Sequence, residues 1–429
     1  MVVGLARGAA MSWLAVALLF GLIFVDVPIG FALMITAAIA MFAVDMPMMT
    51  FPIQMFFGTN SYPLLAIPMF ILMGELMSIS TISARLIDLA SALVGWIRGA
   101  LGHVNVVTNM FMAEMSGSGV ADAAVLGKIF IPEMARKGYP RNYAGAITAV
   151  SATLGIIIPP SIPMVLFGVV TGTSIRDLFI GGIVPGLILG AGYMITNYIF
   201  ARRYDFPKDT RFEVARLGVA FNRALLPLCI PVLVVGGMIY GVFTPTEAAG
   251  VGVVIALLFG LVTSRELTFG SLIGALYTTA IQSSVVMMLV AGSAVLGQYL
   301  ANEQLPQQVA EGLATLSDDP ILLLLLINIF LLILGMFLHA SAAIIVVVPM
   351  LMPIAEQIGL DPVHFGVIVC LNLGIGQQTP PVASILLTVC SVGELRMQDV
   401  LVYAKWFMLT MFIVLMIVSY VPATALWFR

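Results

Sequence analysis

The chain has 429 residues, of which 61% are hydrophobic and only 9% are charged, and its formal net charge is −3 at pH 7. Soluble domains carry about 45–50% apolar and roughly 25% charged residues, so the composition argues against a soluble enzyme, a disordered protein and a nucleic-acid-binding protein. Apolar runs reach the roughly 20 residues that a helix needs to cross a bilayer. The sequence therefore predicts an all-α polytopic membrane protein.

Apolar segments that are candidate membrane spans recur from one end of the chain to the other. The first begins near Trp13 and runs past Asp26, and we expect it to remain as an anchor rather than to be removed as a signal peptide. The candidate spans are 13–26, 29–45, 63–80, 141–158, 162–175, 178–200, 225–243, 246–263, 283–299, 321–338, 362–377 and 403–427. Several are short or interrupted by Pro or Gly.

An amphipathic segment precedes the first polar motif. ISARLIDLASALVGWIRG (82–99) carries Arg85, Asp88 and Arg98 among Leu and Trp side chains. This pattern is typical of a helix that lies in the membrane interface. RELTFGSLIGALYTT (265–279) is predicted to form the corresponding arm helix of the second half.

MSGSGVADAA (115–124) is a small, polar segment inside an apolar region. Gly117 and Gly119 permit a sharp backbone reversal, and Ser116 and Ser118 supply hydroxyl and N–H groups. We predict a re-entrant hairpin over 108–135 with its tip at 116–119. The alternative is close helix packing by small residues, which is common in membranes.

GIIIPPS (155–161) predicts a break in a helix that arrives from Tyr143. Pro159 and Pro160 remove two N–H donors and disfavour helix before them. The carbonyls freed in this way must be buried in protein or line a cavity. Such oxygens are good ligands for a hard cation such as Na⁺, and the N-terminus of the helix that restarts can hold an anionic group.

ARRYDFPKDTRFEVARLGVAFNR (201–223) is a polar connector that divides the chain almost in half. Its basic residues are Arg202, Arg203, Lys208, Arg211, Arg216 and Arg223. The positive-inside rule places it in the cytoplasm. A second basic cluster, formed by Lys128, Arg136, Lys137 and Arg141, is expected on the same side. Docking of a partner is the alternative interpretation of both clusters.

The second half repeats these features in the same order. HASAAIIVV (339–347) predicts a second hairpin tip, with the hairpin continuing to about residue 357, and GIGQQTPPVAS (374–384) predicts a second break. The spacing from Pro159 to Pro380 along the chain is nearly the same as the spacing from Ser116 to His339. An internal repeat with a broken segment in each half is typical of a transporter binding site.

Ionisable residues within apolar segments are functional candidates by default. Glu247 follows Pro245 and is either a helix cap or a site residue. Glu75 and Glu114 are either site residues or interfacial, and His339 either senses pH or makes a hydrogen bond. Neither the cysteines nor the histidines have metal-ligand spacing, which disfavours a zinc site. An intramembrane enzyme, a passive channel and a scaffold are the alternatives to a transporter, and the His-Glu-x-x-His motif of a zinc protease is absent from the sequence.

Four motifs carry a resemblance to a known family. They are MSGSGVADAAVLGKIFIPEMARKGY (115–139), ATLGIIIPPSIPM (152–164), GVFTPTEAAG (241–250) and LDPVHFGVIVCLNLGIGQQTPP (360–381). At these residues, and over nearly its whole length, the chain resembles the large membrane subunit of tripartite ATP-independent periplasmic (TRAP) transporters.

The resemblance implies an inverted-repeat, elevator-type transporter with two re-entrant hairpins and broken helices, and not an enzyme. It implies secondary active uptake of a small organic acid across the bacterial inner membrane, driven by Na⁺ as the coupling ion, without an organic cofactor. The implied partners are a periplasmic substrate-binding protein and a small four-helix TRAP membrane subunit within the lipid bilayer. A binding-protein-independent organic-anion/cation symporter is the alternative. The N-terminus is expected outside and the C-terminus inside.

The resemblance also implies site residues. The residues that match the family's first Na⁺ site are Ser116, Gly155, Ile158 and Pro160. Those that match its second Na⁺ site are Gly335, Gly376, Thr379 and Val382. The resemblance implies substrate contacts at Ser118, Glu247 and His339. The chain departs from the family pattern at Ala113, Glu114, Pro163 and His339. These departures argue against sialic acid as the substrate.

We expect six segments along the chain. They are N-terminal scaffold helices with the first arm helix (1–107), a first-half transport domain with hairpin and broken helix (108–200), the basic connector (201–224), second-half scaffold helices with an arm helix (225–299), a second-half transport domain (300–402) and a C-terminal helix (403–429).

Overall fold

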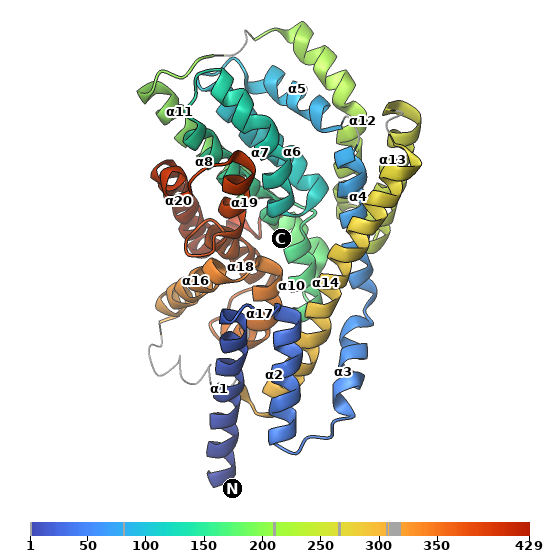
Figure 1. Cartoon of the computed structure of the whole chain (residues 1–429), viewed down its shortest axis with the longest axis vertical. Coiled ribbons are helices and arrows are strands. Elements are labelled where there is room, and N and C mark those ends of the chain that lie inside the picture. The colour runs from blue at the N-terminus through green and yellow to red at the C-terminus, as the bar shows by residue number, and fades with distance from the viewer. Residues whose placement is uncertain (1, 80–81, 209–211, 265–266, 306–307, 309–318) are drawn as a thin grey trace.

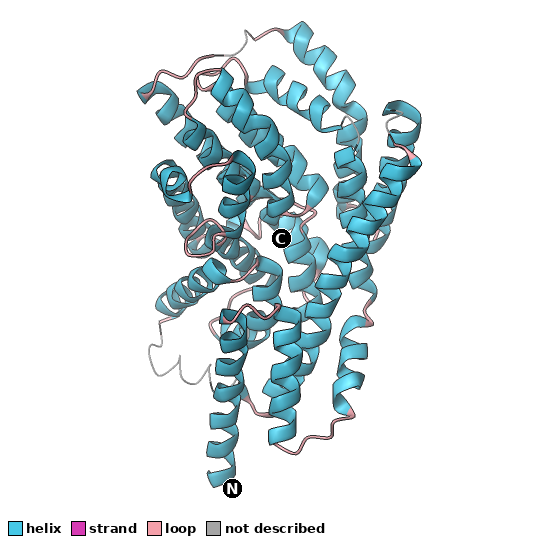
Figure 2. Cartoon of the chain, in the orientation of Figure 1, coloured by secondary structure: helices cyan, strands magenta, loops and turns pink. Residues whose placement is uncertain are grey.

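A computed structural model describes residues 2–79, 82–208, 212–264, 267–305, 308 and 319–429. Within these residues the chain is built of helices and contains no strand (Figure 2). Eight of the described helices are long and apolar enough to cross a membrane. The prediction of an all-α polytopic membrane protein is confirmed.

The first half of the chain contains a series of short and long helices (Figure 1). They are α1 (Val2–Phe24), α2 (Ile29–Ala43), α3 (Thr50–Thr59), η1 (Tyr62–Leu65), α4 (Ala66–Ile79), α5 (Ile82–Val94), α6 (Ala100–Ser116), α7 (Gly119–Arg136), α8 (Arg141–Ala152), α9 (Leu154–Ile157), α10 (Ile162–Thr171) and α11 (Ile175–Arg203). Helix α3 was not among the predicted spans.

The second half follows the same plan. Its helices are α12 (Val214–Ile239), α13 (Pro245–Leu258), η2 (Phe259–Ser264), α14 (Phe269–Asn302), α16 (Pro320–Phe337), α17 (Ala340–Gln357), α18 (Pro362–Gly376), α19 (Ser384–Gly393), α20 (Met397–Tyr420) and η3 (Pro422–Thr424). Helix α18 follows α8, and α20 follows α11, at nearly the offset that separates the two double prolines. The internal repeat predicted from the motifs is therefore present in the order and length of the helices.

The prediction of a separate arm helix over 265–279 is wrong. Residues 269–279 are the first turns of α14, a single helix of 34 residues that packs along α2, α3 and α4. Thr268 and Ser271 form a capping box that starts this helix, and no proline follows to stop it. In the first half, the same repeat offset aligns α14 with three shorter elements, α3, η1 and α4. There Pro63 lies at the start of η1, whereas α14 has no proline at the matching place.

Helices α6 and α7 form a hairpin, which we call hairpin 1, and α16 and α17 form hairpin 2. Both were predicted, but the first arm of hairpin 1 begins at Ala100, because Gly99 takes a left-handed turn with φ +80° that ends the preceding segment. The expected boundary at 107/108 therefore falls inside α6. The boundaries at 299/300 and 402/403 likewise fall inside α14 and α20.

The two hairpins enter the molecule from opposite sides. Arg136 and Lys137 lie at the base of hairpin 1, whereas Asp319 and Glu356 lie at the base of hairpin 2. The positive-inside rule counts Lys and Arg, so the first base is expected in the cytoplasm and the second, which carries neither residue, is expected outside. In Figure 1, α7 lies above the centre of the molecule and α17 below it.

Each hairpin joins the two halves of the chain. Its first arm packs on its own half, α6 on α8 and α9, and α16 on α18. Its second arm packs on both halves, α7 on α8 and α19, and α17 on α18 and α10. The broken helices are thus enclosed by hairpin arms from both halves, which buries backbone that has lost its helical partners.

The connector 201–224 is only partly a linker, and this prediction needs correction. Helix α11 continues to Arg203 and α12 already begins at Val214. Residues 214–224 are helical because Leu217, Ala220 and Ala224 form one apolar stripe, and α12 packs with α5.

The C-terminus and the connector lie at opposite ends of α11. The indole N–H of Trp427 donates to the Ile180 carbonyl at 3.1 Å, and Arg429 pairs with Asp177 in the first turn of α11. Arg203 ends the same helix, which is long enough to span the membrane. An inside C-terminus and a cytoplasmic connector therefore do not both hold. With the connector inside, as its basic residues predict, the C-terminus is expected outside.

Candidate functional site

Break 1, residues 158–161, interrupts the first-half helix between α9 and α10. Ile158 leaves the helical conformation with φ −75° and ψ 128°, the Pro159–Pro160 bond is cis, and α10 restarts at Ile162. All four residues of the break are buried. The predicted interruption of the helix is confirmed.

The two prolines of break 1 deprive two carbonyls of their usual donors. The helical partners of the Gly155 and Ile156 carbonyls are residues 159 and 160, and proline has no N–H. The Ser161 hydroxyl replaces one of them by donating to the Ile156 carbonyl at 2.5 Å. The Gly155 carbonyl, one of the predicted Na⁺ ligands, has lost its i+4 donor.

The tip of hairpin 1 lies directly on break 1. A Cβ added to Gly117, which has φ +58°, would come within 3.0 Å of the Pro160 carbonyl oxygen. A Cβ on Gly155 would come within 2.7 Å of Asp122 Oδ2 and 3.3 Å of the Gly119 nitrogen. Glycine at these positions is what permits the backbone of the tip to approach the broken helix.

Three of the residues predicted for the first Na⁺ site, Gly155, Ile158 and Pro160, therefore line a break that the tip of hairpin 1 covers. Ser116 ends α6 beside this tip, and its side chain lies outside the described ones. Asp122, buried in the first turn of α7, belongs to the same region and was not predicted as a site residue. Its signal in the sequence was a carboxylate inside an apolar segment.

Break 2, residues 377–383, repeats the arrangement with different groups. The Pro380–Pro381 bond is cis, and the i+4 donors of the Gly376 and Gln377 carbonyls are missing. Here backbone N–H groups replace them. Thr379 N–H donates to the Gly376 carbonyl at 2.9 Å, and Ile385 N–H donates to the Gln377 carbonyl at 3.2 Å.

Hairpin 2 packs on break 2 through two glycines. A Cβ on Gly376 would lie 2.5 Å from Gly335 Cα, so neither position has room for a side chain. Val382 N–H donates to the Met336 carbonyl at 3.2 Å. Three of the residues predicted for the second Na⁺ site, Gly335, Gly376 and Val382, are thus brought together. The fourth, Thr379, donates its hydroxyl to the Ile375 carbonyl at 3.0 Å and keeps oxygen lone pairs for a cation.

The donor groups of both breaks fit Na⁺ better than a transition metal. Hard cations take oxygen ligands such as carbonyls and hydroxyls, and these are the groups that the breaks provide. No group of three or more His, Cys, Asp or Glu side chains suited to a metal occurs among the described residues.

Two glutamines within break 2 were missed in the sequence. The Gln378 amide donates to the Ala149 carbonyl of α8 at 2.7 Å, which ties the second half to the first. Gln377 accepts from the Ser384 hydroxyl at 3.1 Å. The Gln377 amide nitrogen and the Gln378 amide oxygen are buried and make no hydrogen bond within the described structure. Buried polar groups of this kind call for a ligand or water, and the Gln-Gln pair beside the double proline was the available signal.

The predicted substrate residues are not gathered at one point. Ser118 caps α7 by accepting from the Ala121 N–H at 3.5 Å, and it lines a small cavity of about 60 Å³ with Glu75 and Gln282. The Gln282 amide donates to Glu75 at 3.5 Å. A pocket for a small molecule usually has a volume of several hundred cubic ångströms, so this cavity is too small to hold a whole organic acid in the present conformation.

Glu247 is a helix cap. Its carboxylate accepts from the backbone N–H and the hydroxyl of Thr244, both at 2.8 Å, and Thr244 accepts in return. This capping box starts α13, which packs mainly on α4 and α12. The capping alternative is confirmed, and a substrate contact by Glu247 stays a prediction.

His339 caps hairpin 2. Its Nδ1 accepts from the Ser341 N–H at 3.4 Å, and the side chain is exposed. With Nδ1 as acceptor, the neutral ring carries its proton on Nε2. His339 therefore presents an N–H donor where an acidic residue would present an acceptor.

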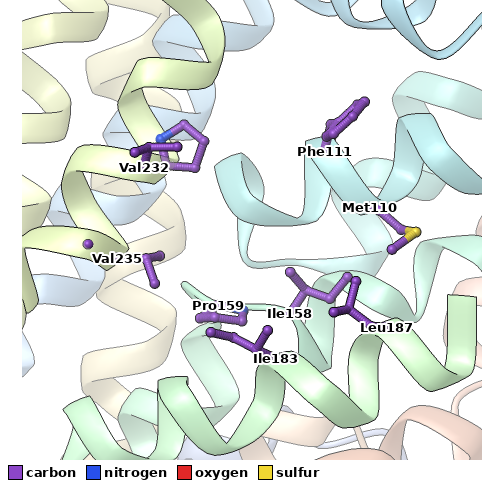
Figure 3. A pocket seen from close by; sticks show the side chains of 10 residues that line it. Met110, Phe111, Ile158, Pro159, Ile183, Leu187, Val232 and Val235 are labelled. Atoms are coloured by element: carbon purple, nitrogen blue, oxygen red, sulfur yellow. The ribbon is translucent and has the colours of Figure 1, made fainter. Parts of the chain in front are cut away.

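A larger cavity beside break 1 is apolar. It has about 360 Å³ and lies between break 1, the first arm of hairpin 1, α11 and α12 (Figure 3). Met110, Ile158, Leu187 and Val232 are among the side chains around it. An organic acid would leave its carboxylate unpaired here, at a high free-energy cost, so this cavity is not the substrate site.

Comparison with known proteins gives consistent matches. Residues 16–424 match the family described as "Tripartite ATP-independent periplasmic transporter, DctM component". The chain is 39% identical to a sialic acid TRAP transporter large permease protein of Vibrio cholerae, over 97% of this chain and 96% of the relative. It is 37% identical to the 2,3-diketo-L-gulonate large permease protein of Escherichia coli, over 94% and 95%. It is also 37% identical to the C4-dicarboxylate large permease protein of Pseudomonas aeruginosa, over 87% and 88%.

A solved structure shares the fold. The Alcanivorax borkumensis YdaH transporter superimposes with a TM-score of 0.60 over 87% of each chain, at 14% sequence identity. At this identity the likeness concerns the fold alone.

Proposed function

The chain belongs to the tripartite ATP-independent periplasmic transporter family as its large permease, DctM, component, and from this premise we propose that it carries out Na⁺-coupled uptake of a small organic acid. It is a multi-pass protein of the bacterial inner membrane. The observation that carries the proposal is the pair of double-proline breaks, each covered by a hairpin with which it shares close backbone contacts.

The chain's residues have distinct parts in the proposed mechanism. The carbonyls of Gly155 and Gly376, together with the Thr379 hydroxyl, would hold Na⁺, which supplies the driving force for uptake. Each hairpin tip would offer the substrate one side-chain donor, the Ser118 hydroxyl in hairpin 1 and the Nε2–H of His339 in hairpin 2. No enzymatic step is part of this mechanism.

The substrate class is an organic acid because the named relatives carry sialic acid, 2,3-diketo-L-gulonate and C4-dicarboxylates. His339, which offers a donor, and Pro163, which offers no side-chain hydrogen bond, favour an acid other than sialic acid. A periplasmic binding protein would deliver it, and a small four-helix subunit would complete the assembly.

The proposed motion is of the elevator type. Hairpins 1 and 2 with both broken helices would move as one unit, because the second arm of each hairpin packs on both halves. Helices α2 to α4 and α12 to α14 would form the stationary scaffold. The apolar walls of the cavity between break 1 and α12 (Figure 3) suit sliding, since no polar contact has to be broken there.

Uptake into liposomes tests the proposal. The purified chain with its small subunit and binding protein is reconstituted, and labelled sugar acids, keto acids and dicarboxylates are offered with an inward Na⁺ gradient. Uptake that requires both Na⁺ and the binding protein is expected. Na⁺-dependent uptake without the binding protein would favour the alternative, an independent organic-anion symporter. Uptake that needs neither would contradict the proposal.

A further inference from the structure

A second polar cavity lies far from the breaks, where two connecting segments meet. It has about 820 Å³ and is lined by residues of the α5–α6 turn, the end of α11 and the segment that leads to α12. Arg98, Arg202 and Lys208 contribute one cation from each of these elements. Among the described residues that line the cavity, Asp205 is the one carboxylate, and it pairs with Arg98. These described residues therefore carry a net positive charge.

The walls of this cavity are fixed by hydrogen bonds and ring packing. The Pro207 carbonyl accepts from the N–H groups of Gly99 at 3.2 Å and Ala100 at 3.4 Å, which also caps the start of α6. The centroid of the buried Phe206 ring lies 4.5 Å from that of the Tyr139 ring. Because both connecting segments are held to each other, the cations line a formed cavity rather than a loose loop.

The cavity is expected at the level of the lipid headgroups. Helix α11 is a candidate span, and Arg202 is in its last turn, on the side that the positive-inside rule assigns to the cytoplasm. Trp96 and Tyr198 also line the cavity and are 44% and 42% exposed. Trp and Tyr gather at the membrane–water interface, and the cytoplasmic leaflet carries anionic lipids.

The geometry points to a binding site for the phosphodiester headgroup of an anionic phospholipid. Arg202 and Lys208 hold the phosphate, and Arg98, oriented by Asp205, supplies further N–H donors. A lipid is favoured over free phosphate because the exposed aromatic side chains lie beside a spanning helix, so that the acyl chains remain in the bilayer while the headgroup enters the cavity.

A headgroup bound in this cavity would contact both the α5–α6 turn and the segment after α11. The α5–α6 turn leads into hairpin 1, and the segment after α11 leads away from the same half of the chain. Binding of a headgroup would thus hold these two connecting segments of the first half together. The binding itself does not depend on the proposed transport activity.

Native mass spectrometry of the full chain in a neutral detergent tests the site. Dioleoyl phosphatidylglycerol is titrated against dioleoyl phosphatidylcholine, and inorganic phosphate is added as a competitor. We expect the anionic lipid to be retained in preference, and millimolar phosphate not to displace it. Replacing both Arg202→Gln and Lys208→Gln should weaken retention of phosphatidylglycerol roughly 30-fold, since each basic residue near an anionic surface strengthens binding about fivefold.

The matched control is Arg203→Gln with Arg223→Gln. It removes the same charge from α11 and α12, at residues that do not line the cavity. Equal loss in both double variants would overturn the site in favour of general surface charge, and so would equal retention of the two lipids. Displacement by phosphate alone would show a soluble-anion site instead. Lys208→Gln alone serves as a second variant. Lys208 lies outside the helices, so this substitution should not disturb folding.

Discussion

The two breaks use the same backbone device and differ in what surrounds it. In both, a double proline removes the i+4 donors of two carbonyls, at corresponding positions of the two halves. In break 1 a side chain, Ser161, satisfies the second carbonyl, and residues 158–161 are buried. In break 2 the backbone N–H of Ile385 does so, and Thr379 to Val382 are partly or fully exposed.

This difference indicates a division of roles between the halves. Break 1 is enclosed, and its only hydroxyl is spent on a structural hydrogen bond. Break 2 is accessible from the surface, and it carries a hydroxyl and two amides. We therefore expect ion and substrate exchange to depend more on side chains at break 2, whereas break 1 relies on backbone geometry.

The largest effect is expected from Gly376→Ala. The added methyl group would lie 2.5 Å from Gly335 Cα, where only backbone is available to move. Overpacking of this kind costs about 1–3 kcal/mol, and the displaced backbone would distort the predicted second Na⁺ site. We expect loss of Na⁺-driven uptake and a lower melting temperature of the purified protein.

Gly374→Ala is the matched control for that experiment. It lies on the same helix, but an added Cβ would be 3.7 Å from Ile156 and 3.9 Å from Thr153, which is ordinary contact. Uptake and melting temperature should stay near those of the parent protein. Equal effects of both substitutions would mean that the close approach of Gly335 and Gly376 has no special role.

Thr379→Val should have the next largest effect. It keeps the shape of the side chain but removes the hydroxyl, whose oxygen faces a partly exposed break. Loss of one hydrogen-bonding or coordinating oxygen is worth about 1.5 kcal/mol, so the Na⁺ concentration for half-maximal uptake should rise about tenfold. An unchanged Na⁺ response would remove Thr379 from the ion site.

The sequence predicts the fold at this site better than the contacts within it. Double prolines, hairpin glycines and the repeat offset are local signals, because proline and glycine act on their own backbone. The hydrogen bond from Gln378 to Ala149 joins the two halves of the chain, and no local pattern encodes it. The prediction at 265–279 was wrong about where the helix ends, because no proline follows to stop it and the helix continues as α14 along α2, α3 and α4.

His339→Asp tests the difference between the hairpin tips. It replaces an N–H donor by an acceptor at the tip of hairpin 2 and leaves Ser118 at the tip of hairpin 1 unchanged. We expect the preference among a panel of organic acids to change by about tenfold, as when one hydrogen bond to a charged group is lost. His339→Gln keeps an N–H donor and should change it less. If both variants kept the uptake profile of the parent protein, His339 would be excluded from substrate recognition.

The smallest functional effect is expected from Ser161→Ala, the counterpart of Thr379→Val in break 1. It removes the hydroxyl that donates to the Ile156 carbonyl at 2.5 Å and leaves that buried carbonyl without this donor. The free energy of unfolding should fall by about 1–2 kcal/mol, and a lower melting temperature would report it. The Na⁺ concentration for half-maximal uptake should stay the same, because this hydroxyl already serves a structural bond. A tenfold rise in that concentration would show that the two breaks bind ions through their side chains alike, and the division of roles between them would be wrong.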